Sequence, residues 1–180
     1  MPEACFQHDQ KGRVCHVWWK RGERPPGLCD KRFTFAYIFA AVEPGTDVVS
    51  KTRLRHDAFA LMLPYANTEA MQEFLDQFSR TIADDEHVAM FTDQAGWHIA
   101  NDLRVPDNIT LIQLPAYSPE LNPVERLWLY LKERFLSHRL LDDYDAIVDA
   151  ACLAWNRLVA EVGRIKSLCT YPWIEAVRMV

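Results

Sequence analysis

The order of strand-like and helix-like segments predicts an α/β fold, with a mixed sheet flanked by helices. Strand-like runs come first, and helix-like and strand-like segments then alternate along the chain. A length of 180 residues suits one domain with a substantial core. The sequence shows no internal repeat and no low-complexity linker. We therefore expect a single domain over residues 1–180.

The first third of the chain predicts an antiparallel meander. Residues 1–32 are irregular, with a candidate strand over 14–19 and a candidate turn over 21–27. Aromatic residues then alternate in the period of a strand from Phe33 to Phe39, and 58–65 predicts a neighbouring strand. The polar stretch 46–57 indicates no element.

The rest of the chain predicts helices alternating with two buried strands. Asn67 suits a helix N-cap, and the apolar residues that follow have helical spacing. Strands are expected over 87–93 and 109–114, with a short helix and a loop between them. A proline-rich loop leads to a helix from Pro123 to about His138, and a last helical region begins near Asp142 or Asp143. The apolar faces comprise Met71, Phe74, Leu75, Phe78 and Ile82 in the first helix, Val124, Leu127, Trp128, Leu131 and Phe135 in the second, and Ile147, Ala151, Ala154, Trp155 and Leu158 in the last.

Composition narrows the classes of protein. Hydrophobic residues make up 49% and charged residues 25%, which is ordinary for a globular protein. No apolar run is long enough to span a bilayer, and the first residues lack a signal-peptide pattern. The odd number of cysteines and the absence of a CxxC pair argue against a disulfide framework or a zinc site and favour the cytoplasm. The five are Cys5, Cys15, Cys29, Cys152 and Cys169.

A net charge of −5 does not indicate nucleic-acid binding, but the charge is unevenly spread. Between positions 11 and 32 there are seven basic residues and two acidic residues, Glu23 and Asp30. They form either a solvated basic hairpin or a strip that contacts phosphates, with Trp18 and Trp19 available for stacking. The candidate DNA-contacting residues are Lys11, Arg13, Trp18, Lys20, Arg21 and Arg24.

Asp93 follows directly after a predicted buried strand. In α/β sheets, chemistry gathers at the carboxyl ends of strands. A carboxylate there either closes an Asx turn or points into a cleft as a ligand. His98 lies five positions on, as either a structural hydrogen-bonding residue or a supporting group at the same rim.

Glu125 lies in the first turn of the predicted helix that follows the proline loop. Asn122 suits the N-cap and Pro123 the first helical position, so Glu125 could complete a capping box. The alternative is a metal ligand, which needs a second carboxylate from a separate element. Magnesium binds a few carboxylates and keeps waters and substrate phosphates as its other ligands. Asp93 and Glu125 meet this description.

These segments resemble the DDE-type transposases of the bacterial insertion-sequence branch related to mariner elements. The residues that carry the resemblance are "LPAYSPELNPVERLWLYLKERF" (114–135), "MFTDQAGWH" (90–98) and "WWKRGERPPG" (18–27). The 31 residues between Asp93 and Glu125 are a spacing of that family's kind. The resemblance extends to "YPWI" near the end of the chain.

The resemblance implies an RNase H-like fold and metal-dependent cleavage and strand transfer of DNA in transposition. Asp93 and Glu125 would be the second and third residues of a D, D, E triad that holds two Mg²⁺ or Mn²⁺ ions, and His98 would support them. It also implies DNA partners (transposon ends and target), a homodimer as a candidate assembly, a place at the bacterial nucleoid, and neither a membrane nor a small-molecule cofactor.

The N-terminal residues depart from the family. Pro2 stands where the first catalytic aspartate is expected, and Glu3 or Asp9 are the acidic residues nearby. We therefore expect a domain that lacks its first strand and the N-terminal helix-turn-helix domain. Two alternatives follow: a non-catalytic transposase remnant that at most binds DNA or a partner chain, and a different RNase H-like nuclease.

Overall fold

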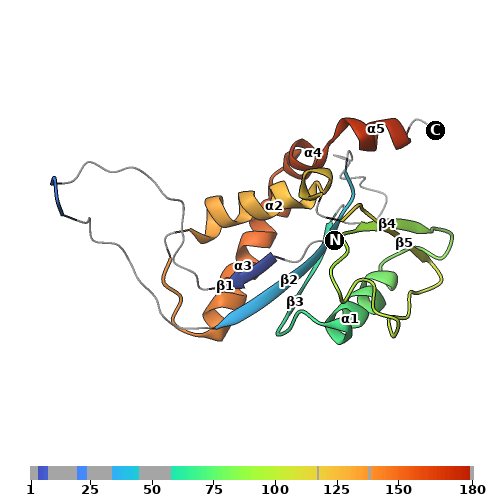
Figure 1. Cartoon of the computed structure of the whole chain (residues 1–180), viewed down its shortest axis with the longest axis horizontal. Helices are drawn as coiled ribbons and strands as arrows, with labels where there is room; N and C mark the ends of the chain where they lie inside the picture. Colours follow the sequence, from blue (N-terminus) through green and yellow to red (C-terminus); the bar gives the residue numbers. More distant parts are fainter. Residues whose placement is uncertain are drawn as a thin grey trace.

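The computed structural model describes residues 4–7, 20–23, 34–44, 58–116, 118–137 and 139–178. The strands of this part of the chain form two sheets (Figure 1). The first is antiparallel, in the order β1 (Ala4–Gln7), β2 (Phe35–Val42) and β3 (Ala58–Leu63). The second is a parallel pair of β4 (Val88–Thr92) and β5 (Ile109–Gln113). The strands and helices confirm the predicted α/β class, but in place of the one mixed sheet that was predicted, the described residues form an antiparallel sheet and a separate parallel pair.

The middle strand of the first sheet, β2, is buried on both faces because successive side chains of a strand point to opposite sides. Ile38 and Ala40 belong to one hydrophobic cluster, which also contains residues of three helices. Phe39 belongs to a second cluster, with residues of α1 (Thr68–Ser79), β4 and β5. The core therefore has two layers, one on each side of β2.

Helix α1 covers one layer. Asn67 caps it as predicted, since its Oδ1 accepts the Ala70 backbone N–H at 2.8 Å. Met71, Phe74 and Leu75 are fully buried. The spacing of apolar residues thus identified most of the buried face of this helix, although Phe78 is half-buried and Ile82, itself buried, lies after the end of α1.

Four further helices follow β5, and the first three supply the other layer. A 3₁₀ turn (Pro119–Leu121) precedes α2 (Val124–Leu131), which continues as one π-helical turn (Lys132–Leu136). Next come α3 (Tyr144–Ala160), capped by Asp143, then α4 (Arg164–Cys169) and α5 (Pro172–Arg178). The predicted apolar faces of α2 and α3 are buried, with Phe135 half-buried.

Two expectations about the fold need correction. The expectation that the first strand is lacking is wrong, because Ala4–Gln7 forms β1, which pairs with Phe35–Ile38 and satisfies backbone groups at that edge of β2. The expected short helix within 94–108 is absent there. That segment consists of turns closed by hydrogen bonds from the His98 N–H to the Ala95 carbonyl and from the Leu103 N–H to the Ala100 carbonyl.

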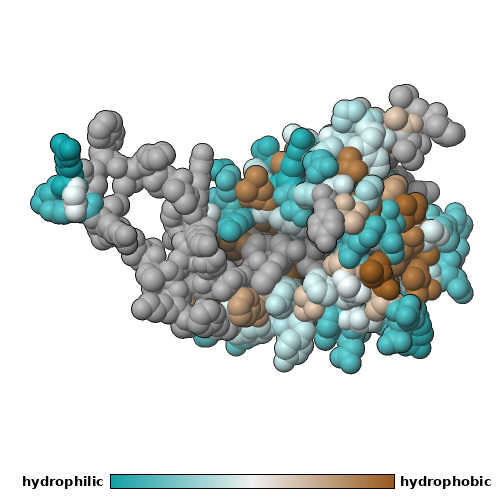
Figure 2. All heavy atoms as spheres, in the orientation of Figure 1, coloured by the Kyte–Doolittle hydropathy of each residue, from teal (hydrophilic) through white to brown (hydrophobic). Residues whose placement is uncertain are grey.

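The face of the β4–β5 pair that points away from α1 is partly exposed. Figure 2 shows apolar side chains gathered over the part of the surface where these strands lie. Phe91 of β4 and Ile112 of β5 are 36% and 38% exposed. Within the described residues, no helix is long and apolar enough to cross a membrane.

Candidate metal centre

Asp93 follows the last residue of β4 and is held by its own local turn. Its Oδ1 accepts the Ala95 backbone N–H at 3.0 Å and the His98 Nδ1–H at 2.7 Å. The Asx turn, one of the two alternatives that the sequence left open for Asp93, therefore forms. Both hydrogen bonds go to Oδ1, and within the described residues Oδ2 accepts none. The turn orients the carboxylate and leaves one oxygen available to a cation.

His98 is buried and serves this carboxylate. Its ring is also 3.3 Å from the Asp93 carbonyl oxygen and stands edge-on to Trp97. Burial by itself would raise the pKa of Asp93, but the hydrogen bonds from His98 and the Ala95 N–H outweigh it, so the pKa is lowered. Asp93 is accordingly a carboxylate at neutral pH.

The ends of β4 and β5 are joined by a contact that the sequence did not reveal. The Gln94 side-chain amide donates to the Leu114 carbonyl at 3.1 Å, and the Leu114 N–H donates to the Thr92 carbonyl at 2.7 Å. The proline loop that leads to α2 thus starts beside Asp93. A polar residue directly after a strand-ending aspartate is too common to have signalled this contact.

Glu125 lies in the first turn of α2, and a capping box was one of the two alternatives that the sequence left open for its side chain. The capping box does not form. The Asn122 backbone N–H, which the box would use, donates to the Pro119 carbonyl of the 3₁₀ turn at 3.0 Å. The Asn122 side chain still helps to start the helix, accepting the Val124 N–H at 3.3 Å. No described residue donates a hydrogen bond to the Glu125 carboxylate.

The structure brings the two candidate ligands into one electrostatic environment. The pKa of Glu125 is raised, first because surrounding protein partly desolvates its carboxylate and second because the negative charge of Asp93 acts on it. The carboxylates at the end of β4 and at the start of α2, far apart in the sequence, are therefore near enough for the charge of one to act on the other. His98 is linked to this pair by its hydrogen bond to Asp93.

The donor set fits a hard divalent cation. Two carboxylates that repel each other are relieved by a positive charge between them, and Mg²⁺ or Mn²⁺ sites often use one or two protein carboxylates. The described residues bring no group of three or more His, Cys, Asp or Glu side chains together. The candidate protein ligands in this part of the chain are thus Asp93 and Glu125.

The N-terminal candidates lie largely outside the described residues. This applies to Lys11, Arg13, Trp18 and Arg24, and to Pro2, Glu3 and Asp9 of the expected first-ligand region. Lys20 and Arg21 are described and exposed, in a turn where Lys20 approaches Glu23 at 4.0 Å. Their exposure suits a surface contact, and their role in DNA binding stays a prediction.

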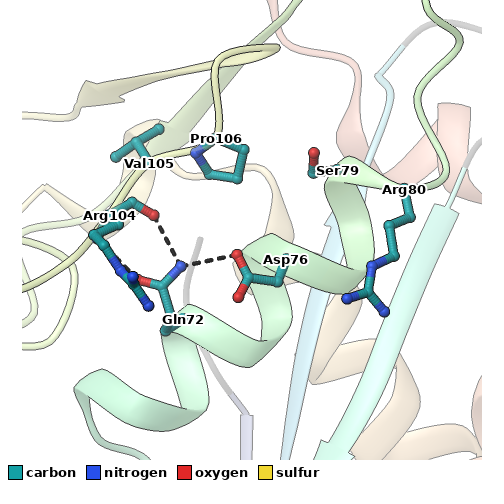
Figure 3. Close-up of a pocket in the computed structure, with 7 residues that line it drawn as sticks. All are labelled: Gln72, Asp76, Ser79, Arg80, Arg104, Val105 and Pro106. Carbon is teal, nitrogen blue, oxygen red and sulfur yellow. Dashed lines mark hydrogen bonds between the residues drawn. The ribbon is translucent and has the colours of Figure 1, made fainter.

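A groove of about 440 Å³ lies elsewhere, between α1 and the segment that precedes β5 (Figure 3). The Gln72 side chain spans it, accepting the Arg104 N–H at 2.8 Å and donating to the Arg104 carbonyl and to Asp76, both at 2.9 Å. None of the residues that line it was predicted as a functional residue. These contacts secure the segment to α1, so we assign the groove a structural role.

A comparison with known protein families finds a family whose sequence pattern this chain matches. The sequence model described as DDE superfamily endonuclease covers residues 3–148, most of the chain. The chain belongs to this family. Both candidate ligands, the Asx turn and the start of α2 lie within the matched residues. The family assignment predicted from the sequence is therefore confirmed at the level of the DDE endonuclease superfamily.

Two individual proteins are similar to this chain. A protein of Sinorhizobium fredii (strain NBRC 101917 / NGR234), named uncharacterized protein y4pE/y4sA, is 45% identical over 139 residues, which cover 77% of this chain and 96% of the relative. When this chain is compared with the crystal structure of the Mos1 strand transfer complex, the TM-score is 0.56 and the sequence identity is 14%. That match covers 94% of this chain and 53% of the other, so the chain spans about half its length. The likeness supports the RNase H-like fold.

Proposed function

We propose that this protein is a DDE-type transposase domain that cleaves DNA phosphodiesters and transfers the freed strand with the help of divalent metal ions. The observation that carries the proposal is that Asp93, at the end of β4, and Glu125, at the start of α2, both lie within the residues that match the DDE superfamily endonuclease family. Family membership and the likeness of the fold to the Mos1 structure support it.

In this proposal Asp93 and Glu125 hold Mg²⁺ or Mn²⁺. The bound ion supplies Lewis-acid stabilisation of the phosphodiester's charge and activates the attacking oxygen. His98 and the Ala95 N–H hold Oδ1 of Asp93, which would leave Oδ2 to bind the cation. The rigid first turn of α2 fixes Glu125. Lys20 and Arg21 are candidate contacts to the DNA backbone, and a homodimer is the assembly expected from the family resemblance.

A nicking assay tests this function. Supercoiled plasmid DNA becomes relaxed by one nick in any sequence, so it needs no knowledge of the preferred DNA ends. We expect nicking with Mn²⁺, loss of nicking with EDTA, and loss in Asp93→Ala and Glu125→Ala. Glu133→Ala removes an acidic side chain from the π-helical turn after α2. It is the matched control and should retain activity. Nicking that survives both ligand changes would exclude the assigned residues.

A second candidate is a non-catalytic transposase remnant that binds DNA or a partner chain. The observation in its favour is that the described residues bring only two carboxylates together. Electrophoretic mobility shift of duplex DNA separates the two. Binding without nicking by the wild-type chain at saturating Mn²⁺ would support the remnant.

A further inference from the structure

A short segment that follows the matched family region contacts both elements that carry the candidate ligands. It runs from Cys169, the last residue of α4, to Trp173 in the first turn of α5. In Figure 1, α4 lies beside the start of α2, and α5, which follows it, contacts β4 through Trp173. We call residues 169–173 the brace. It follows residues 3–148, the part of the chain that the family model matches.

Two contacts join the brace to the start of α2. The Cys169 thiol, fully buried, lies 3.7 Å from the Pro123 carbonyl oxygen and donates to it. The Arg126 guanidinium lies over the Tyr171 ring, 4.4 Å from its centroid. Pro123 is two residues before Glu125 and Arg126 is the next residue, so both contacts flank the candidate ligand.

A third contact joins the brace to β4. The Trp173 ring meets Phe91 edge-on, with ring centroids 5.3 Å apart. Phe91 is two residues before Asp93, and side chains two apart in a strand point to the same face. The brace thus contacts the chain within two residues of each carboxylate.

These contacts place one segment across the two elements whose separation sets the metal centre. Resting on the proposed function, we propose that the brace is a positioning device for the carboxylate pair, with Tyr171 and Trp173 as its positioning residues. By holding Pro123 and Arg126 on one side and Phe91 on the other, it fixes how far Glu125 lies from Asp93. We expect metal affinity to depend on that distance, because mutation of residues that orient metal ligands typically lowers the affinity by about 10- to 100-fold.

Burial of polar groups gives the proposal a specific probe. Within the described residues, the Trp173 Nε1 atom is buried without a hydrogen-bond partner. An unpaired buried N–H opposes folding, so it is the ring that makes Trp173 favourable here. Trp173→Phe keeps a ring against Phe91 and removes the unpaired N–H, whereas Trp173→Leu removes the ring. In the same way, Tyr171→Phe keeps a ring under Arg126 and Tyr171→Leu does not.

The experiment combines Mn²⁺ titration calorimetry with hydrogen–deuterium exchange on the whole chain. Trp173→Leu and Tyr171→Leu should weaken Mn²⁺ binding about tenfold or more. They should also speed exchange in peptides covering 91–98 and 122–127 while α1 stays protected. Trp173→Phe and Tyr171→Phe should keep both the Mn²⁺ affinity and the slow exchange of the wild-type protein.

Tyr130→Leu provides the matched control. Tyr130 lies near the other end of α2 and makes the same kind of contact, with the Arg164 guanidinium 5.0 Å from its ring centroid. Its hydroxyl also donates to Glu161 at 2.7 Å. This variant should lose stability and keep its Mn²⁺ affinity, because its contacts lie away from Glu125.

The outcomes separate the brace from the proposed function. Wild-type protein that binds no Mn²⁺ would overturn the proposed function, and exchange would still test whether the brace orders both segments. Unchanged exchange in both leucine variants would overturn the brace. Faster exchange with unchanged Mn²⁺ affinity would also overturn it, since the segment would then hold the fold without setting the ligands.

Discussion

At the scale of single residues, Glu125 is a ligand candidate that opposes the stability of the metal-free fold. Its pKa is raised, so in the folded state its carboxylate is less favourable than in the unfolded chain. The backbone hydrogen bonds that start α2 do not use its side chain. Stability and metal binding should therefore respond in opposite directions to its neutralisation.

We expect Glu125→Gln to stabilise the protein in EDTA at pH 7 by about 0.5 kcal/mol, the usual scale for a partly exposed charge pair. For a domain of this size, that is about 1–2 °C in Tm. A raised carboxyl pKa penalises folding above the folded-state pKa and ceases to do so below 4.5, the ordinary value. The advantage should thus vanish as pH falls below 4.5. Thermal unfolding from pH 4 to 7 measures it; a variant that is less stable at every pH would contradict it.

The Asp93–His98 pair gives the opposite pH dependence. The pKa of Asp93 is lowered, so its carboxylate favours folding above the ordinary value of 3.8 and loses that effect as pH falls through the lowered pKa. His98→Ala removes one of the two bonds to Oδ1 and should cost about 1.5–3 kcal/mol at pH 7, with a smaller cost at pH 3. Urea unfolding measures both.

His87→Ala is the control for that change. His87 also makes a side-chain hydrogen bond, to Thr110 at 2.7 Å, but it is exposed. Its loss should cost less than about 1 kcal/mol. Equal costs for the two histidines would show that burial beside Asp93 is not what makes His98 important.

The local features of the centre were largely predictable, and its internal geometry was not. The strand before Asp93 could be predicted from the apolar run, and the Asx turn was an alternative suggested by the residue type. The capping box failed because a 3₁₀ turn over Pro119–Leu121 takes the Asn122 N–H first, and short proline turns give no periodic signal. Gln94 was missed because its partner, Leu114, is 20 residues away.

At the scale of elements, α2 carries the candidate ligand Glu125 on an exposed part of its surface, while its opposite face packs in the core. The Leu127 side chain is completely buried in the core, whereas Leu129 of the same helix is 57% exposed. The helical period of the apolar residues predicts this difference. The position of Glu125 therefore depends on the buried face of α2.

Leu127→Ala should destabilise the protein by about 2–5 kcal/mol, since it leaves a cavity between α2 and the sheet. Leu129→Ala, the same change on the exposed face, should stay within about 0.5 kcal/mol. Chemical unfolding with a common m-value measures both. If the two variants lost equal stability, the assigned buried face of α2 would be wrong.

At the scale of the whole molecule, the predicted α/β class is confirmed, but the later helices were less visible in the sequence. One helical region was predicted after Asp142, where the structure has α3, α4 and α5. Gly163, in the left-handed conformation with φ 76°, lies in the turn between α3 and α4. Helices as short as α4 and α5 owe their stability to tertiary contacts, and no local pattern reports those contacts.

Metal binding would act on the whole molecule, because a cation held by both Asp93 and Glu125 would link β4 to α2. At a Mn²⁺ concentration one hundred times Kd, binding to the folded state alone adds about 2.7 kcal/mol. For a domain of this size, Tm should rise by about 5–10 °C relative to EDTA. Asp93→Asn and Glu125→Gln should remove most of that rise, although Glu125→Gln starts from a more stable metal-free state. Glu120→Gln, in the 3₁₀ turn before α2, should keep the full rise. Differential scanning calorimetry measures all four proteins, and an equal rise in every one would place the bound metal away from this pair.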